Sequence, residues 1–228
     1  MMALQNRVDP FGDIHAVDAR GMFTGNRGII HDPTTKTLLK KRWTTKAWII
    51  CSCEYKRVRR DPMGRNGPNG RAGWTELFFL DEVTALAAGH RPCFTCRREA
   101  AREFSACFAK GNDLPSVAAR GIDRMLHGER RASGGTLRKL TPEEAWTLPD
   151  GTMVEQAGLA LAILGEWLVP WFHEGYGRIV SRTAVEEGDT FLLTPPATVA
   201  AIRSGYRPIW SATLRDFEAN ADLIGPDI

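Results

Sequence analysis

The chain has 228 residues, of which 43% are hydrophobic and 25% are charged, values that are ordinary for a globular protein of one or two domains. No apolar run is long enough to span a bilayer and no signal-peptide pattern opens the sequence, so we expect no association with a membrane. Five cysteines without a signal peptide indicate a reducing, cytoplasmic location, and they favour metal binding over disulfides.

The first part of the chain alternates between unpatterned and strand-like segments. Residues 1–25 show little periodicity, and we expect an irregular arm with at most a short strand. Residues 28–31 and 48–55 are rich in β-branched and aromatic side chains and are expected to form strands. The glycine- and proline-rich segment 61–71 is expected to be a loop, and a loop of this length is either functional or a solvated surface feature.

The segment 40–71 carries a local excess of positive charge. It contains ten lysines and arginines but only two acidic residues, Glu54 and Asp61. Such a surface suits a phosphate backbone or another polyanion. The residues that we expect to contact phosphates are Lys56, Arg57, Arg59, Arg60, Arg65 and Arg71. Trp43, Trp48 and Trp74 flank the segment, where they either belong to the core or stack on the bases of a single strand.

A short strand, a short helix and a cysteine pair follow the basic segment. Residues 77–80 form an apolar run bounded by polar residues, which predicts a buried strand. Asp81 is placed to cap a short helix that Gly89 ends. Cys93 and Cys96 are then expected at the start of a second helix, whose amide dipoles favour thiolates.

The C-x-x-C turn supplies half of a tetrahedral metal site, because it places two sulfurs on one side. The expected strand 48–55 carries Cys51 and Cys53, and residues two apart in a strand face the same side. We therefore expect zinc to be bound by Cys51, Cys53, Cys93 and Cys96. Such a site is structural or holds a reactive thiolate; in a third interpretation Cys51 and Cys53 are core thiols and no metal binds.

The pattern F-F-x-D-x-x-x-A-x-x-A-G-H-R-P-C-x-x-C resembles the metal-binding module at the N-terminus of the Ada adaptive-response protein. The matching residues, about a tenth of the chain, are Phe78, Phe79, Ala85, Ala88, Gly89, Arg91, Pro92, Cys93 and Cys96. The resemblance implies zinc with two further ligands upstream, which are cysteines in Ada and a histidine beside a cysteine in related appended domains. It makes His31 the rival of Cys53 as fourth ligand. It also implies a link to DNA repair or processing.

Helices are expected to follow the cysteine pair, over residues 93–111, 116–129 and 141–146. The third is expected to begin with a capping box, in which Thr141 is the cap and Glu144 follows three residues later. In the second helix Asp123 and His127 are four residues apart on one face, so the carboxylate can orient the imidazole as a general base or a metal ligand. A surface or capping role is the simpler interpretation. No G-x-S-x-G, phosphate loop or dinucleotide fingerprint accompanies the pair.

The last part of the sequence predicts a β-meander with turns near Gly158 and Gly165, a strand over residues 191–193 and one helix that ends at Gly205. The fold class is therefore expected to be α+β, with a small zinc-binding sheet and flanking helices in the N-terminal half. We expect an Ada-like metal-binding domain over residues 1–111, a helical connector over 112–149 and a β-rich unit over 150–228.

These observations favour a zinc-stabilised protein that binds nucleic acid, either DNA or RNA. The first alternative is an enzyme with a cleft site, which uses a zinc-held thiolate as an alkyl acceptor or uses Asp123 and His127 as the acid-base pair of a hydrolase. The second alternative is a scaffold whose arginine-rich loop binds an acidic protein.

Overall fold

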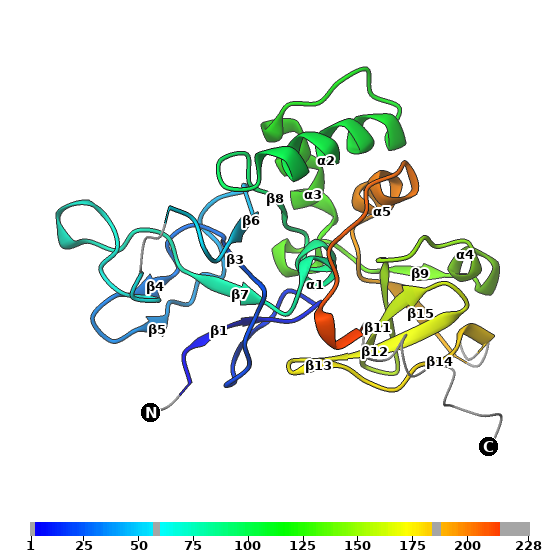
Figure 1. The fold of residues 1–228 in the computed structure, drawn as a ribbon, viewed down its shortest axis with the longest axis horizontal. Coiled ribbons are helices and arrows are strands. Elements are labelled where there is room, and N and C mark those ends of the chain that lie inside the picture. Colours follow the sequence, from blue (N-terminus) through cyan, green and yellow to red (C-terminus); the bar gives the residue numbers. More distant parts are fainter. Residues whose placement is uncertain (1–2, 57–59, 184–187, 215–228) are drawn as a thin grey trace.

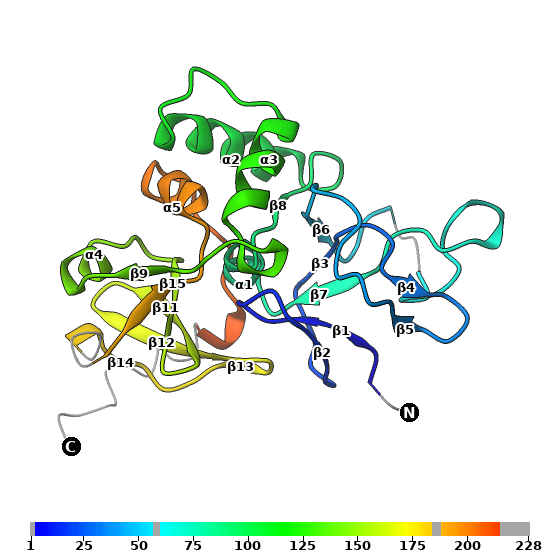
Figure 2. The same cartoon turned by 180° about the vertical axis from the view of Figure 1, so that it is seen from behind.

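The computed structural model describes residues 3–56, 60–183 and 188–214, and it builds them into two larger β-sheets with helices above and between them (Figures 1 and 2). The N-terminal sheet has the strand order β2-β1-β7-β3-β6-β8. Its strands are β1 (Gln5–Val8), β2 (Ile14–Ala16), β3 (Phe23–Asn26), β6 (Ile49–Ser52), β7 (Leu77–Phe79) and β8 (Arg91–Pro92). The short strands β4 (His31–Asp32) and β5 (Thr37–Leu38) pair with each other.

The N-terminal segment is more ordered than the sequence predicts. The expected irregular arm contains β1, β2 and most of β3, and the strand expected over residues 28–31 is wrong except at His31. The reason is Gly28, whose φ of +95° turns the chain out of the sheet after Asn26. The amide of Thr75 then donates to the Gly28 carbonyl (3.0 Å), which fixes the exit of the chain from the sheet.

The C-terminal sheet is antiparallel and has the order β13-β12-β11-β10-β15-β9, with β14 also paired to β12. Its strands are β9 (Arg138–Leu140), β10 (Met153–Gln156), β11 (Leu159–Leu164), β12 (Trp167–Phe172), β13 (Gly175–Tyr176), β14 (Val180–Ser181) and β15 (Thr190–Leu192). The predicted β-meander is confirmed as β10-β11-β12. Gly158 and Gly165, at its two turns, have φ of +82° and +55°, which favours glycine there.

The helices are α1 (Glu82–Ala87), α2 (Arg98–Gly111), α3 (Ala119–Glu129), α4 (Pro142–Trp146) and α5 (Pro196–Arg203). Helices α2 and α3 both contact α5, which lies below α2 in Figure 1. Helix α4 begins with the predicted capping box between Thr141 and Glu144. Sheets and helices are both present, so the predicted α+β class is confirmed.

The buried apolar clusters extend across the expected domain boundaries. One cluster combines Phe79 of the N-terminal sheet, Phe104 of α2, Ile122 of α3 and Ile202 of α5. A second cluster joins α1 to the strands of the C-terminal sheet. The boundaries after residues 111 and 149 stay predictions, and the segments on either side of them share these cores.

A buried carboxylate at the start of α1 binds the C-terminal part of the chain. Asp81 is fully buried and caps α1, because one carboxylate oxygen accepts from the amide of Thr84 at 2.8 Å. Its other oxygen accepts from the hydroxyl of Tyr176 (2.8 Å) and the amide of Ser211 (3.0 Å). Burial raises the pKa of Asp81, while these hydrogen bonds act in the opposite direction. The cap of one helix is therefore also an anchor for two distant segments.

The next residue, Glu82, makes a second buried connection. Its carboxylate is fully buried and accepts from the Arg97 guanidinium at 2.7 Å and from the Tyr206 hydroxyl at 2.6 Å. The other carboxylate oxygen accepts from the amide of Ile209 at 3.0 Å. Each partner compensates part of the cost of burying the charge. Glu82 thus joins the start of α2 to the chain that follows α5.

A third buried polar cluster surrounds Trp48, the residue just before β6. The guanidinium carbons of Arg27 and Arg130 lie 3.9 and 3.8 Å from the ring of Trp48, and all three side chains are buried. Arg27 also donates to His90 at 3.2 Å. Gly89 has φ of +78°, and a Cβ there would lie 2.7 Å from the Arg130 side chain. These contacts fix the residues that lead into β6 and into β8, namely Trp48 and the pair Gly89 and His90.

The connection made by Asp81 predicts a large loss of stability when it is removed. Asp81→Ala should lower the free energy of unfolding by about 3 kcal/mol, because it removes a helix cap and leaves a buried hydroxyl and a buried amide without an acceptor. Thr141→Ala removes the exposed cap of α4 and should cost only about 1 kcal/mol. Urea denaturation measures both, and equal losses would contradict the role given to Asp81.

Burial of His90 predicts a loss of stability in mild acid. Burial, together with the charges of Arg27 and Arg130, lowers the pKa of His90 well below its ordinary value. The unfolded chain therefore binds a proton below about pH 6.5 that the folded protein does not bind, and stability falls by up to about 1.4 kcal/mol per pH unit. Denaturation at pH 7.5 and 5.5 should show a smaller loss for His90→Gln than for the wild type. Carboxylates contribute equally to both proteins, so identical losses would refute the prediction.

Candidate metal centre

The pairing of β6 with β8 brings two distant cysteines together. The strands are parallel, with Ile50 opposite Pro92, and the amide of Cys93 donates to the Ile50 carbonyl at 2.9 Å. Cys51 and Cys93 each follow one member of that opposed pair. The register between β6 and the two-residue strand β8 therefore sets the position of Cys51 relative to Cys93.

The C-x-x-C segment forms a tight turn between β8 and α2. The amide of Thr95 donates to the sulfur of Cys93 at 3.4 Å, and the amide of Arg97 donates to its carbonyl at 3.0 Å. Helix α2 begins only at Arg98, so the prediction that the cysteines open the helix is wrong. The turn directs its amides at the sulfur, an arrangement that stabilises a thiolate.

The thiols of Cys51, Cys93 and Cys96 lie within 4.8 Å of one another. Hydrogen bonds from Cys51 and Cys96 lower the pKa of Cys93, and the same close contacts raise the pKa of Cys51. The amide of Ser52 also donates to Cys96. Tetrahedral zinc with sulfur at about 2.3 Å requires sulfurs about 3.8 Å apart, so a small inward shift suits these thiols to zinc. The three cysteines can hold a metal ion.

The two residues predicted to compete as fourth ligand lie apart from this group. Cys53 follows the end of β6, and its exposed thiol donates to the Met22 carbonyl at 3.4 Å. His31 is buried, with its Nδ1 2.7 Å from the hydroxyl of Thr75 and its Nε2 3.4 Å from the carbonyl of Gly64. The identity of a fourth ligand stays a prediction.

A pocket of about 330 Å³ opens onto the cysteines. All four predicted ligands of the cysteine set line it, together with Tyr55, Arg60, Trp74 and Glu76. The Arg60 guanidinium carbon lies 3.5 Å from the ring of Trp74, which is 40% exposed. Glu76 was not predicted; its buried carboxylate accepts from the amide of Met63 at 2.9 Å. The one sequence signal for a role of Glu76 at this site is its position directly before the buried strand β7.

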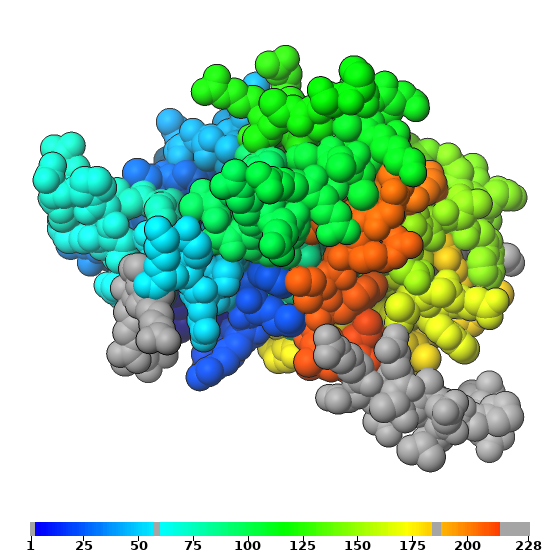
Figure 3. Space-filling view, turned by 45° about the horizontal axis from the view of Figure 1, so that its top comes forward, coloured from blue at the N-terminus to red at the C-terminus, as the bar shows by residue number. Residues whose placement is uncertain are grey.

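Of the predicted phosphate contacts that the structure describes, Arg60 lines this pocket, and Arg65 and Arg71 lie in the segment 61–71 that follows it. Arg57 and Arg59 lie outside the described residues, whereas Lys56, Arg65 and Arg71 are exposed and Arg60 is half-buried. The segment of residues 60–76, which precedes β7, projects from one end of the molecule (Figures 1 and 3). Trp48, by contrast, belongs to the buried core.

Asp123 and His127 have separate partners. Both carboxylate oxygens of Asp123 accept from the buried guanidinium of Arg91, at 2.8 and 3.0 Å. The ring of His127 lies 4.7 Å from that of Trp43, edge to face, and its Nδ1 is 3.3 Å from Arg130. Burial lowers the pKa of His127, and Arg130 adds to the effect. Asp123 therefore holds β8 against α3, and it is engaged by Arg91.

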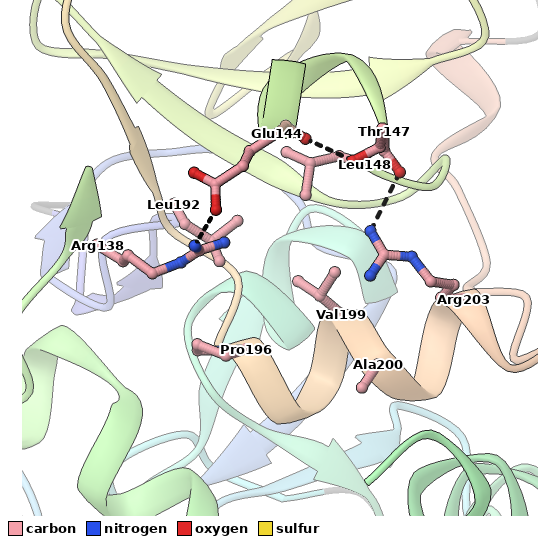
Figure 4. A pocket seen from close by; sticks show the side chains of 9 residues that line it. All are labelled: Arg138, Glu144, Thr147, Leu148, Leu192, Pro196, Val199, Ala200 and Arg203. Atoms are coloured by element: carbon pink, nitrogen blue, oxygen red, sulfur yellow. Dashed lines mark hydrogen bonds and ion pairs between the residues drawn. The ribbon is translucent and has the colours of Figure 1, made fainter. Parts of the chain in front are cut away.

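A second hollow, of about 250 Å³, lies between α4, α5 and β9 (Figure 4). Its two arginines already have partners. Arg138 pairs with Glu144 at 2.6 Å, and Arg203 donates to the carbonyl of Thr147 at 3.1 Å. The floor between them is apolar. This hollow offers no group of ligand or nucleophilic side chains like the one at the cysteines.

Comparison with known proteins adds no assignment, since no family model, curated protein or solved structure matches the chain. The likeness to the Ada module therefore rests on the sequence pattern and the cysteine group alone. No helix in the described ranges is both long and apolar enough to cross a membrane.

The cysteine group predicts one zinc ion per chain. Cys51→Ser, Cys93→Ser and Cys96→Ser should each reduce bound zinc at least tenfold (about 1.4 kcal/mol or more), because each removes one of three soft ligands. Cys107→Ser, which changes a half-buried thiol of α2, should retain the metal. Elemental analysis of the purified variants measures this. A folded wild-type protein free of metal after exposure to zinc would contradict it.

Proposed function

We propose that this protein binds zinc through Cys51, Cys93 and Cys96 and binds nucleic acid through the basic residues beside that site. The observation that carries the proposal is the position of Arg60. This predicted phosphate contact lines the same pocket as the three cysteines. A metal-ordered turn and a basic side chain are therefore adjacent, and basic side chains are what a phosphate backbone binds.

The projecting loop supports the proposal through its exposed charges. Arg65 donates to the carbonyl of Gly70 at 3.2 Å and to the hydroxyl of Thr34 at 2.9 Å. Both acceptors are uncharged, so they position the guanidinium without neutralising it. Arg71 is exposed at the end of the same loop. Such cations bind phosphates by releasing counterions.

A second basic surface lies near α3. Lys46, which is distant in the sequence, lines a hollow of about 400 Å³ together with Arg120 and Arg124 of α3. All three side chains are exposed. This hollow adds phosphate-binding capacity beyond the six residues that the sequence predicted.

Two other functions remain as alternatives. The pocket beside the thiols favours an enzyme in which a metal-held thiolate reacts. The contacts of Asp123 give no support to the hydrolase, because both of its carboxylate oxygens accept from Arg91 and not from His127. A scaffold that binds an acidic protein would use the same arginine loop. Retention of partners after nuclease treatment of a pull-down would favour the scaffold.

The proposal predicts the salt dependence of binding. Replacing Arg65 and Arg71 together with glutamine should weaken binding to a DNA or RNA oligonucleotide and reduce the slope of log K against log salt by about 2, one unit for each lost phosphate contact. Arg102→Gln with Lys110→Gln removes the same charge from exposed positions of α2. Fluorescence anisotropy titrations at several salt concentrations measure both. The same slope in both double variants would refute the assignment of the loop.

A further inference from the structure

We propose that the metal at this site has three protein ligands, Cys51, Cys93 and Cys96, and that its fourth position opens to the adjoining pocket, where it takes a neutral aromatic nitrogen heterocycle. The inference rests on the zinc-binding part of the proposed function. It concerns what the site does with the metal, which neither the sequence pattern nor the cysteine spacing indicates.

The first support is the arrangement of the cysteines. Three thiols converge within 4.8 Å, while the thiol of Cys53 donates to the Met22 carbonyl. Because β6 ends at Ser52, the alternation that would place Cys53 on the same side as Cys51 does not extend to it. Zinc sites with three protein ligands bind exogenous molecules at the remaining position, whereas sites with four are closed.

The second support is the pocket itself. Its volume of about 330 Å³ is at the lower end of the range for small-molecule sites, which suits one ring system. Its lining includes the three thiols, Cys53, Trp74 and Tyr55. Both aromatic side chains are partly exposed, at 40% and 37%. The Arg60 guanidinium already covers one face of the Trp74 ring, so a ligand would stack on the opposite face of that ring. Flat rings bind such surfaces by stacking.

The charge of the site selects the class of ligand. A divalent ion with three thiolates has a net charge of −1, and a neutral fourth ligand adds no further negative charge to the site. The Glu76 carboxylate in the wall adds to this negative charge, although Arg60 lies 3.5 Å from it and compensates in part. A ring nitrogen, as in imidazole or a purine, is neutral and is also a good zinc ligand. The ligand is therefore a heterocycle that coordinates through nitrogen and stacks on Trp74.

The test uses the full chain, loaded with zinc for X-ray absorption and with cobalt for visible absorption. The zinc spectrum should give three sulfurs and one nitrogen or oxygen, unchanged in Cys53→Ser and in His31→Gln. Four sulfurs, one of them lost in Cys53→Ser, would overturn the inference, and so would a nitrogen lost in His31→Gln. Absence of any bound metal would instead mean that the proposed function itself fails.

Ligand binding is tested on the cobalt protein. Imidazole should shift the visible bands, and pyrrole, a ring of the same size whose nitrogen has no available lone pair, should not. Trp74→Ala should retain cobalt but raise the half-effect concentration of imidazole about tenfold, the loss expected for one stacking contact. Adenosine and an oligodeoxyadenylate then distinguish a free heterocycle from a base within a strand. No shift with any of the three nitrogen ligands would overturn the inference.

Discussion

The parallel pairing of β6 with β8 is the constraint on which the candidate site depends. It places Cys93 beside Cys51, which is 42 positions earlier in the sequence, through the amide of Cys93 and the carbonyl of Ile50. A two-residue strand has little stability of its own, so its position must be fixed by side chains. The bidentate pair of Arg91 with Asp123 on one side and the stacking of buried arginines on Trp48 on the other supply that restraint.

The same region connects the two sheets. Asp81 and Glu82 follow β7 directly, and their carboxylates bind hydroxyls and amides from the C-terminal part of the chain. Buried charges of this kind are costly unless every oxygen is satisfied, so the two halves must form together for either carboxylate to be buried. The C-terminal sheet is therefore part of the framework that holds β7, α1 and, through them, the cysteine turn.

The sequence predicted local features well and long-range ones poorly. The meander, the cap at Asp81 and the box at Thr141 were confirmed because each depends on neighbours within a few residues. The strand order of the N-terminal sheet was not predicted, because β7 inserts between β1 and β3, a pairing that no local pattern encodes. At the site, three cysteines converge as predicted, but the period-2 argument for Cys53 required a strand longer than β6. Buried arginines such as Arg130 were not foreseen, because arginine is usually exposed.

Anomalous diffraction from crystals of the zinc-loaded protein, recorded on both sides of the zinc absorption edge, tests the central claim most directly. The account predicts one strong peak at about 2.3 Å from the sulfurs of Cys51, Cys93 and Cys96. A well-ordered crystal with no peak among those three sulfurs, or with its zinc held by other residues, would contradict it.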